Sequence, residues 1–263
     1  MSGHAGAGTW TIDAIDTGTS TLEQSMLTYT SGIGRIATIP RVIWVLRGPT
    51  TVVVDTSVPA GRRASEFIGE VLERTPDQEP PNALRLAGVD PGDVETVILT
   101  HLHWDHAGNC DLFPDASILV QDAELRYAIA PGRFFRKAFL APSSGWGIPP
   151  YLVPNLVPIH GEQEILPGLR VVPAPGHTPG SQAIIVDTAH GSFCIAGDAI
   201  STYENIDAEL PPGYHVNVDD SMDSMDRLRA AADHLLPSHD YAVFSDGPVT
   251  RIGAAHAAPR NQR

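Results

Sequence analysis

Residues 100–109, which read THLHWDHAGN, constrain this chain more than any other stretch of it. They follow the apolar run VETVIL, residues 94–99, which is typical of a buried strand. Coordinating side chains that directly follow a buried strand lie at the edge of a sheet where α/β proteins usually bind ligands. His101 and His103 are two residues apart, so on an extended loop both can face one metal ion. Asp105 and His106, further along the motif, can face a second ion.

The rest of the chain alternates between short strands and helices, which indicates an α/β fold. β-Branched runs bounded by turn residues predict strands at 9–15, 42–47, 51–56, 117–121, 169–174, 182–188 and 192–198. Helical apolar spacing predicts helices at 62–75, 82–88, 122–130 and 219–236, and residues 241–246 are expected to close the core. Two strand-rich halves without short repeats would pack as a sandwich with helices outside.

Three more coordinating side chains follow core elements in the second half. His177 lies in the turn APGHTPGS, Asp198 ends an apolar strand, and His239 comes directly after a helix. A dinuclear site needs six or seven such groups to converge. The sequence therefore predicts two divalent metal ions, with zinc as the first expectation. Iron, cobalt and manganese also suit imidazole and carboxylate ligands.

Composition limits the class of partner. The 31 acidic and 17 basic side chains give a formal net charge of -14, so attraction to a phosphate backbone is absent as a driving force. We expect a small-molecule partner, and neither nucleic acid nor membrane. The start MSGHAGAGTW does not read as a signal peptide, and Cys110 and Cys194 are the only cysteines, which favours reduced thiols and a cytoplasmic location. With 42% hydrophobic residues, the expectation is a single domain over residues 1–263.

Residues 131–156 break the alternation with proline, glycine and aromatic residues in no clear period, and we expect a lid or entrance segment there. Its aromatic residues could line the entrance or belong to the core, and its basic residues could steer a carboxylate-bearing substrate or simply be solvated. A contact in a homodimer is a further use of the segment. The side chains concerned are Phe134, Phe135, Trp146 and, outside the segment, Trp104, together with Arg133, Arg136 and Lys137.

The pieces HLHWDH, PGHTPGS, GDA and PSHD, in this order between about residues 40 and 245, resemble the metallo-β-lactamase superfamily. The resemblance implies an αββα sandwich with two metals in a cleft at its edge. It implies a first metal on His101, His103 and His177, a second on Asp105, His106 and His239, and Asp198 as the bridge. Asp55 in VVVDTS matches a family position that orients a ligand histidine, although an aspartate at a strand end can also just cap a turn.

Within the superfamily the chain is most similar to the N-acyl homoserine lactonase and pyridoxolactone hydrolase branch, in IPRVIWVLRG, in DAISTYEN and in the stretch that begins PPGYHVN. True β-lactamases of the superfamily generally lack the bridging aspartate, so Asp198 disfavours antibiotic hydrolysis. In this branch a tyrosine shortly after that aspartate binds the lactone carbonyl. Ser201 stands at this position, so Tyr203, two residues on, is the candidate catalytic helper. His215 is a further candidate for the pocket.

The expected function is therefore metal-dependent hydrolysis of a small-molecule lactone by attack of metal-bound hydroxide, with Asp105 passing a proton to the leaving alkoxide. The alternative is a thioester or other ester hydrolase similar to glyoxalase II. A phosphodiesterase or nuclease, a mononuclear iron dioxygenase that uses only the first three ligands, and a non-catalytic binding module are further alternatives. Two metals per chain together with lactone turnover would select the lactone hydrolase over all of these alternatives.

Overall fold

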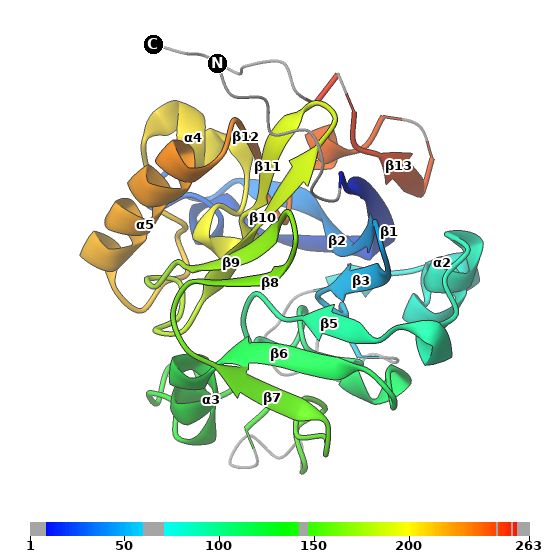
Figure 1. The fold of residues 1–263 in the computed structure, drawn as a ribbon. Coiled ribbons are helices and arrows are strands. Elements are labelled where there is room, and N and C mark those ends of the chain that lie inside the picture. Colours follow the sequence, from blue (N-terminus) through cyan, green and yellow to red (C-terminus); the bar gives the residue numbers. More distant parts are fainter. Residues whose placement is uncertain (1–8, 60–70, 142–146, 246, 254, 257–263) are drawn as a thin grey trace.

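The computed structural model describes residues 9–59, 71–141, 147–245, 247–253 and 255–256 (Figure 1). Its strands are β1 (Thr11–Glu23), β2 (Ile36–Arg47), β3 (Thr51–Val54), β4 (Val71–Glu73), β5 (Thr96–Ile98), β6 (Ser117–Gln121), β7 (Leu156–Ile159), β8 (Gln163–Leu166), β9 (Leu169–Pro173), β10 (Gln182–Thr188), β11 (Gly191–Ile195), β12 (His234–Leu236) and β13 (Val249–Arg251). Its α-helices are α2 (Pro80–Leu86), α3 (Asp122–Ile129), α4 (Tyr203–Ala208) and α5 (Val218–Ala231).

Among these described residues the strands form two sheets. The larger has the order β13-β1-β2-β3-β5-β6-β7, with β4 paired to β1, and the smaller has the order β12-β11-β10-β9-β8. Strands β3, β5, β6 and β7 run parallel, so their carboxyl ends share one edge of the larger sheet. That edge carries the histidine motif, which follows β5.

The two sheets pack face to face with helices on the outside (Figure 1), which confirms the expected αββα sandwich. Side chains of a strand alternate between its two faces. On β2, Val42, Trp44 and Leu46 point into the core between the sheets, while Ile43 and Val45 pack toward the outer layer with α2 and α3. On β10, Ile184 and Val186 face the same inner core, and Ala183 and Ile185 face α5. Strands that are apolar on both faces therefore require a covering layer on each side.

Two helix predictions were wrong at their ends. Of the helix expected at 62–75, residues 62–70 lie outside the described residues, and Val71–Glu73 form β4, which pairs antiparallel with β1. The helix expected at 219–236 ends at Ala231, and His234–Leu236 form β12, which pairs parallel with β11. In both cases pairing to a sheet edge, which local spacing does not record, decided the structure.

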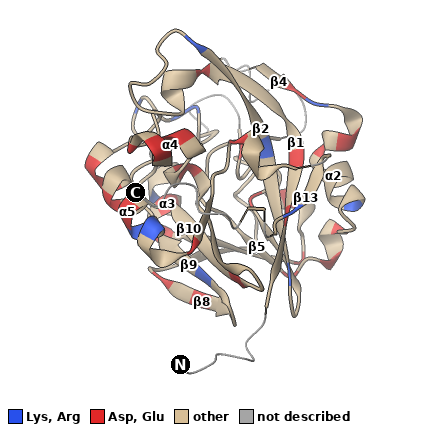
Figure 2. Cartoon of the chain, turned by 90° about the horizontal axis from the view of Figure 1, so that it is seen from above, with Lys and Arg blue, Asp and Glu red and all other residues tan. Residues whose placement is uncertain are grey.

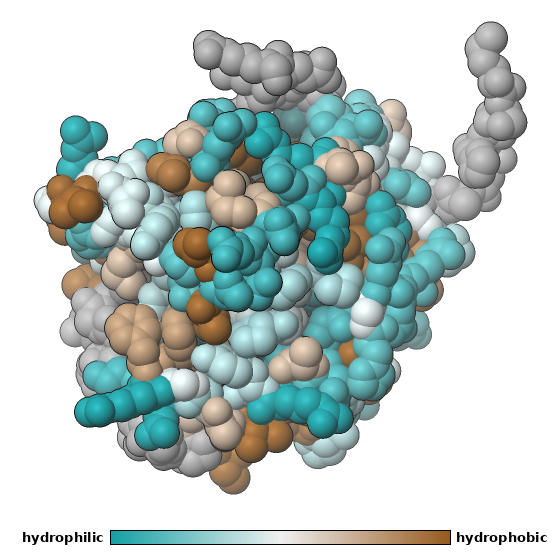
Figure 3. All heavy atoms as spheres, turned by 90° about the vertical axis from the view of Figure 1, so that its left-hand side faces the viewer, coloured by the Kyte–Doolittle hydropathy of each residue, from teal (hydrophilic) through white to brown (hydrophobic). Residues whose placement is uncertain are grey.

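The cysteines, the helices and the surface are the features on which the predicted location and partners depend. Both cysteines are free and buried, and no described helix is long and apolar enough to cross a membrane. Acidic residues are spread over several elements, α4 and α5 among them (Figure 2). On the face drawn in Figure 3, hydrophobic residues lie in small separate groups among hydrophilic ones. The cytoplasmic location, the absence of nucleic-acid and membrane partners, and a homodimer stay predictions.

Candidate metal centre

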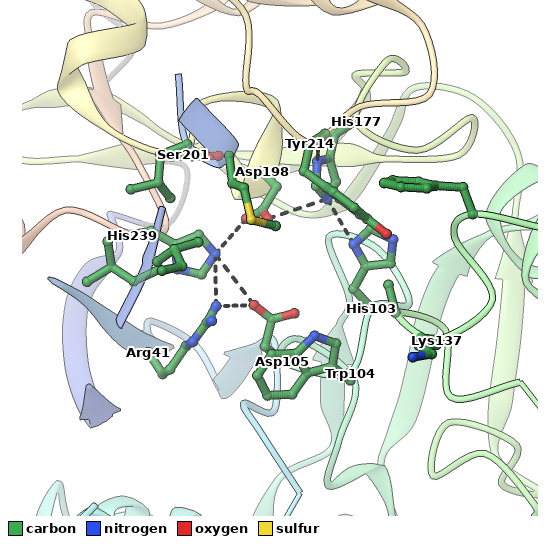
Figure 4. Close-up of a pocket in the computed structure, with 16 residues that line it drawn as sticks. Arg41, His103, Trp104, Asp105, Lys137, His177, Asp198, Ser201, Tyr214 and His239 are labelled. Carbon is green, nitrogen blue, oxygen red and sulfur yellow. Dashed lines mark hydrogen bonds and ion pairs between the residues drawn. The ribbon is translucent and has the colours of Figure 1, made fainter. Parts of the chain in front are cut away.

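All seven predicted ligands come from loops or short turns that follow a strand. His101, His103, Asp105 and His106 follow β5, His177 follows β9, and His239 follows β12. Asp198 lies in a short 3-10 helix, Gly197–Ala199, directly after β11. The loops of both sheets meet at one end of the sandwich, so residues far apart in sequence converge there (Figure 4).

The structure sorts the seven side chains into two groups whose ligand atoms each lie within 4.8 Å of one another. The first group is His101, His103 and His177, and the second is Asp105, His106, Asp198 and His239. All seven residues are buried. This is the same partition that the family resemblance implies, with Asp198 on the border between the groups.

Asp198 faces both groups with different oxygen atoms. Its Oδ2 lies 3.4 Å from His177 Nε2, while its Oδ1 lies 3.0 Å from His239 Nε2 and 3.2 Å from His106 Nε2. Ser238 donates a hydrogen bond of 2.6 Å to Oδ1, which fixes the carboxylate. One carboxylate that turns one oxygen to each group has the geometry of a bridge between two cations.

The ring nitrogens indicate what the groups can hold. Within the described part of the chain, Nε2 of His101, His103 and His106 is buried without a hydrogen-bond partner. Leaving a buried polar atom unpaired costs about 1–3 kcal/mol, and three in one cluster is unusual for a folded protein. Divalent cations coordinated by Nε2 of His101 and His106 remove that cost, so the residues present fit a metal centre. His103 turns its other nitrogen to the first group, because its Nδ1 lies 2.9 Å from His177 Nε2.

The opposite nitrogen of several rings is held by a fixed acceptor, as is common for metal-binding histidines. His106 Nδ1 lies 2.8 Å from Asp55 Oδ2, His177 Nδ1 lies 2.6 Å from the Tyr214 carbonyl, and His239 Nδ1 lies 3.2 Å from the Pro40 carbonyl. Each contact places the proton on Nδ1 and leaves Nε2 to face the cluster. Asp55, at the end of β3, reaches the motif after β5 because the two strands are parallel neighbours.

Burial and neighbouring charges set the protonation of the cluster. Burial and nearby histidines lower the pKa of His101 and His103 well below the usual range. Burial would raise the pKa of Asp105, but the Arg41 guanidinium and His106 hold it well below its usual range. Neutral imidazole and ionised carboxylate are the forms that bind metals. Burial also acts to lower the pKa of His106, yet the surrounding carboxylates, first Asp198, raise it well above its ordinary value.

A pocket of about 460 Å³ opens over the cluster. Its floor holds ligand side chains from both groups, and Arg41 and Lys137 bring positive charge to it. The remaining wall is largely apolar and is formed by Leu22, Met26, Leu27, Ile39, Trp104, Phe134, Ala138 and Tyr214, with Ser201 at its edge. A pocket with a coordinating floor and an apolar wall suits a small organic molecule that presents one polar group to the metals.

The structure does not bring Tyr203 to this pocket, which corrects the prediction of a catalytic role. Its ring is 8% exposed and belongs to the core between the sheets, and its hydroxyl donates to the Leu235 carbonyl at 3.2 Å. Residue 203 begins α4, and its backbone N–H is capped by Asp240, so the side chain turns toward β12. Ser201, two residues earlier, does line the pocket.

Other predicted side chains divide between the pocket and its surroundings. Trp104, Phe134 and Lys137 line the pocket, while Phe135 contacts the ring of Tyr214 at 5.2 Å between centroids. His215 Nδ1 lies 2.6 Å from the Pro212 carbonyl and its ring packs on Tyr29, so it is placed by its own loop. Arg133 and Arg136 are exposed and are not among the lining residues, and Trp146 lies outside the described residues.

Sequence reasoning missed seven of the lining residues, and Arg41 and Tyr214 are the two among them that carry a charge or a hydroxyl group. Arg41 stands inside the apolar run IPRVIWV of β2, and a single charge within a buried strand was the signal that could have found it. Tyr214 lies in a proline- and glycine-rich loop with no period to place it. Its ring packs against His103 and His177, at 5.8 and 6.0 Å between centroids.

The sandwich and the clustered ligands define a metalloenzyme with its site at the edge of two packed sheets. The chain belongs to the metallo-beta-lactamase superfamily, whose family model matches residues 39–239. With this family and this ligand set, it is a metal-dependent hydrolase.

Curated relatives and solved structures are similar over most of the chain. The N-acyl homoserine lactonase AiiA of Bacillus thuringiensis subsp. kurstaki is 29% identical over 209 residues, which cover 75% of this chain and 78% of the relative. The N-acyl homoserine lactonase AttM of Rhizobium radiobacter is 30% identical over 175 residues, or 64% of each chain. An N-acyl homoserine lactone hydrolase, solved with the product N-hexanoyl-L-homoserine at its catalytic metal centre, is 25% identical with a TM-score of 0.74 over 88% of this chain and 94% of that one.

Proposed function

We propose that this chain hydrolyses small-molecule lactones with two divalent metal ions, zinc being the first choice. The relatives named N-acyl homoserine lactonase support the substrate class. The observation that carries the proposal is Asp198, which turns Oδ2 to the first group of ligands and Oδ1 to the second. A shared carboxylate keeps two cations close enough to act on one substrate.

In this proposal His101, His103 and His177 hold one ion, Asp105, His106 and His239 hold the other, and Asp198 is shared. When bound, two such ions lower the pKa of a water molecule and polarise the lactone carbonyl. The Nδ1 contacts of His106, His177 and His239 with Asp55, Tyr214 and Pro40 aim Nε2 of each ring into the site.

Asp105 has a second role, as the proton carrier of the reaction. Its carboxylate is ionised by the positive charge of Arg41 and lines the pocket. Opening a lactone frees an alkoxide on the former ring oxygen, which needs a proton before the product leaves. In this proposal Asp105 would accept the proton that the attacking water gives up and deliver it to that oxygen, so that the elements of water are added across the ester bond.

The apolar wall binds the rest of the substrate. Leu22, Met26 and Ile39 of the β1–β2 region line the pocket together with Phe134 and Tyr214, and these side chains exclude water around an apolar ring substituent. Phe134 is 75% exposed at the mouth, and Lys137 and Ala138 follow it into the lining. Within residues 131–156 we therefore assign 134–138 to the entrance of the pocket, while Tyr151 is buried in the outer core.

The test is a pH-indicator assay of lactones with homoserine, aliphatic and aromatic rings, run beside a panel of thioesters. We expect proton release with at least one lactone class, loss of that activity after chelation, and recovery when zinc is restored. Asp198→Asn should lose turnover and one of two bound metals, while Asp90→Asn, which changes an exposed aspartate, serves as the control. Turnover of thioesters without any lactone would contradict the proposal and select the ester hydrolase alternative.

A further inference from the structure

Arg41 is a buried cation that the proposed reaction does not require as a ligand. It lies on β2 and is 1% exposed. Its Nε donates to Ser20 Oγ at 2.9 Å, and its guanidinium carbon lies 5.0 Å from the centre of the Trp104 ring. Burying a guanidinium is costly and adds little net stability compared with an apolar residue of similar volume. Stability of the fold therefore does not explain why an arginine stands here, and we look for its role in the metal site.

The Arg41 guanidinium contacts an oxygen atom of Asp105 that also faces other ligands of the second group (Figure 4). Its Nη1 contacts Asp105 Oδ2, and the same Oδ2 lies 3.5 Å from His106 Nε2 and 3.6 Å from His239 Nε2. Arg41 Nη1 itself lies 3.5 Å from His239 Nε2. A divalent ion bound at about 2.0–2.2 Å from these ligand atoms must sit next to the guanidinium. The ion and Arg41 would thus face the same carboxylate oxygen, with their positive charges close together.

We propose that Arg41 weakens metal binding at the second group, so that the two ions load in sequence, the first group before the second. This inference rests on the ligand assignment of the proposed function and adds its regulation. Two positive charges at this separation repel strongly in a buried site. The contacts named above involve Asp105 and His239, both of the second group, so the effect falls on that group.

Removing the charge leaves most of the second group in place. His106 is aimed by Asp55 at 2.8 Å, His239 by the Pro40 carbonyl at 3.2 Å, and Asp198 by Ser238 at 2.6 Å. None of these three hydrogen bonds involves Arg41. The loss of repulsion should therefore outweigh the loss of the contact that orients Asp105.

The experiment is a zinc titration of the metal-free full-length protein against a chelator of known affinity, with elemental analysis of the loaded protein. We compare the wild type with Arg41→Gln and Arg41→Met, which remove the charge, and with Arg41→Lys, which keeps it. Arg47→Gln is the matched control, because Arg47 lies on the same strand but pairs with Asp13. We expect the second ion to bind about tenfold or more tightly in the two uncharged variants. The first ion should bind as in the wild type.

The inference is overturned if the second ion binds no more tightly, or more weakly, in both uncharged variants. A wild type that retains one ion while Arg41→Gln retains two would support it. Arg41→Met preserves the apolar stem over Trp104, so it tests the same charge if the glutamine variant does not fold; thermal unfolding of each metal-free variant shows which is usable. Because the readout is metal affinity, the result stands whether or not lactones are turned over.

Discussion

At the scale of single residues, the site depends on hydrogen bonds that aim imidazole rings, and Asp55 is the clearest case. It accepts from His106 Nδ1 at 2.8 Å and from the Thr100 backbone N–H at 2.7 Å. Its backbone has φ 59°, a conformation that asparagine also tolerates, so Asp55→Asn removes the charge without straining the chain. We expect zinc affinity or activity to fall by roughly 10–100-fold.

Chelator-competition titration of Asp55→Asn beside the exposed control Asp90→Asn checks this expectation. The control should bind zinc as the wild type does. An Asp55→Asn protein that matched the control would mean that the aspartate only caps the turn after β3.

The substrate side of the pocket could not be predicted residue by residue. Four of the seven ligands lie in one motif with short, local spacing, and each of the other three directly follows a strand, so their positions could be predicted and all seven converge. On the substrate side, by contrast, the direction of a helix start or a loop decides which side chains reach the pocket, as for Ser201, Tyr203 and Tyr214. The Tyr203 hydroxyl donates to the Leu235 carbonyl, away from the pocket. Tyr214 lines the pocket from a loop that is held in place because the Tyr214 backbone N–H donates to the Met26 carbonyl. Such pairings join residues far apart in the sequence, and a single sequence does not record them.

Glu124 is a buried carboxylate with a titration that stability measurements can detect. It is fully buried and accepts hydrogen bonds from Leu102 N, Thr178 Oγ1 and Gly180 N. Burial raises its pKa from 4.5 to about 7, against the opposing effect of these donors. Between those values the folded protein binds more protons than the unfolded chain, so the contribution of Glu124 to the free energy of unfolding falls as pH rises.

Glu124→Gln removes this titration. The free energy of unfolding of the wild type minus that of the variant should fall by roughly 3 kcal/mol between about pH 4.5 and pH 7, since one pKa unit is worth about 1.4 kcal/mol. Urea unfolding of the metal-free proteins across this range measures the difference. Glu95→Gln changes an exposed glutamate and should show no such slope. A difference that is constant or rises with pH would contradict the assignment.

At the scale of elements, helix α3 and the loop after His177 are held together at Gly180. A Cβ on this glycine would lie 2.0 Å from the Glu124 backbone nitrogen and 2.4 Å from its Cα, and neither backbone atom can move alone. Gly180→Ala should therefore push the loop away from α3 and destabilise the fold by about 1–3 kcal/mol. The same shift should weaken zinc binding by the first group, because His177 lies on that loop.

Gly92→Ala is the matched control for this prediction, because its added Cβ meets only Asp90 Oδ1 at 3.5 Å. Thermal unfolding and zinc titration of both variants provide the two readouts. If Gly180→Ala lost stability but bound the first ion normally, α3 would support the fold without positioning His177.

The elements themselves were predictable where apolar residues repeat strongly. The runs at 117–121 and 182–188 form β6 and β10 within the expected bounds, because both faces of each strand are buried and β-branched residues fill them. The sequence did not reveal β4 and β12, each of three residues, because a short strand exists only through its neighbour in the sheet. Strand β1 likewise runs on to Glu23, well beyond the predicted end at residue 15, through pairing with β2 and β4.

At the scale of the whole molecule, the inner core and the metal centre both depend on two sheets meeting. Strands β1, β2 and β3 of one sheet and β9, β10 and β11 of the other contribute to the core between them. The first group of ligands takes residues from the loops that follow β5 and β9, one strand from each sheet. A metal ion held there ties the two halves together. The single domain expected over residues 1–263 stays a prediction that this shared core supports.

Metal removal should therefore lower the stability of the whole fold. A ligand that binds only the folded state adds about 2.7 kcal/mol at a hundred times its dissociation constant, and for a chain of this size 1 kcal/mol shifts Tm by roughly 2–4 °C. Zinc added to the metal-free protein should thus raise Tm by about 5–10 °C for each tightly held ion. In Asp198→Asn the shared ligand of both groups is lost, so excess zinc should raise Tm by less than half as much as in the wild type. Scanning calorimetry with and without zinc measures both shifts, and an unchanged response in Asp198→Asn would show that the two groups bind their ions without a common carboxylate.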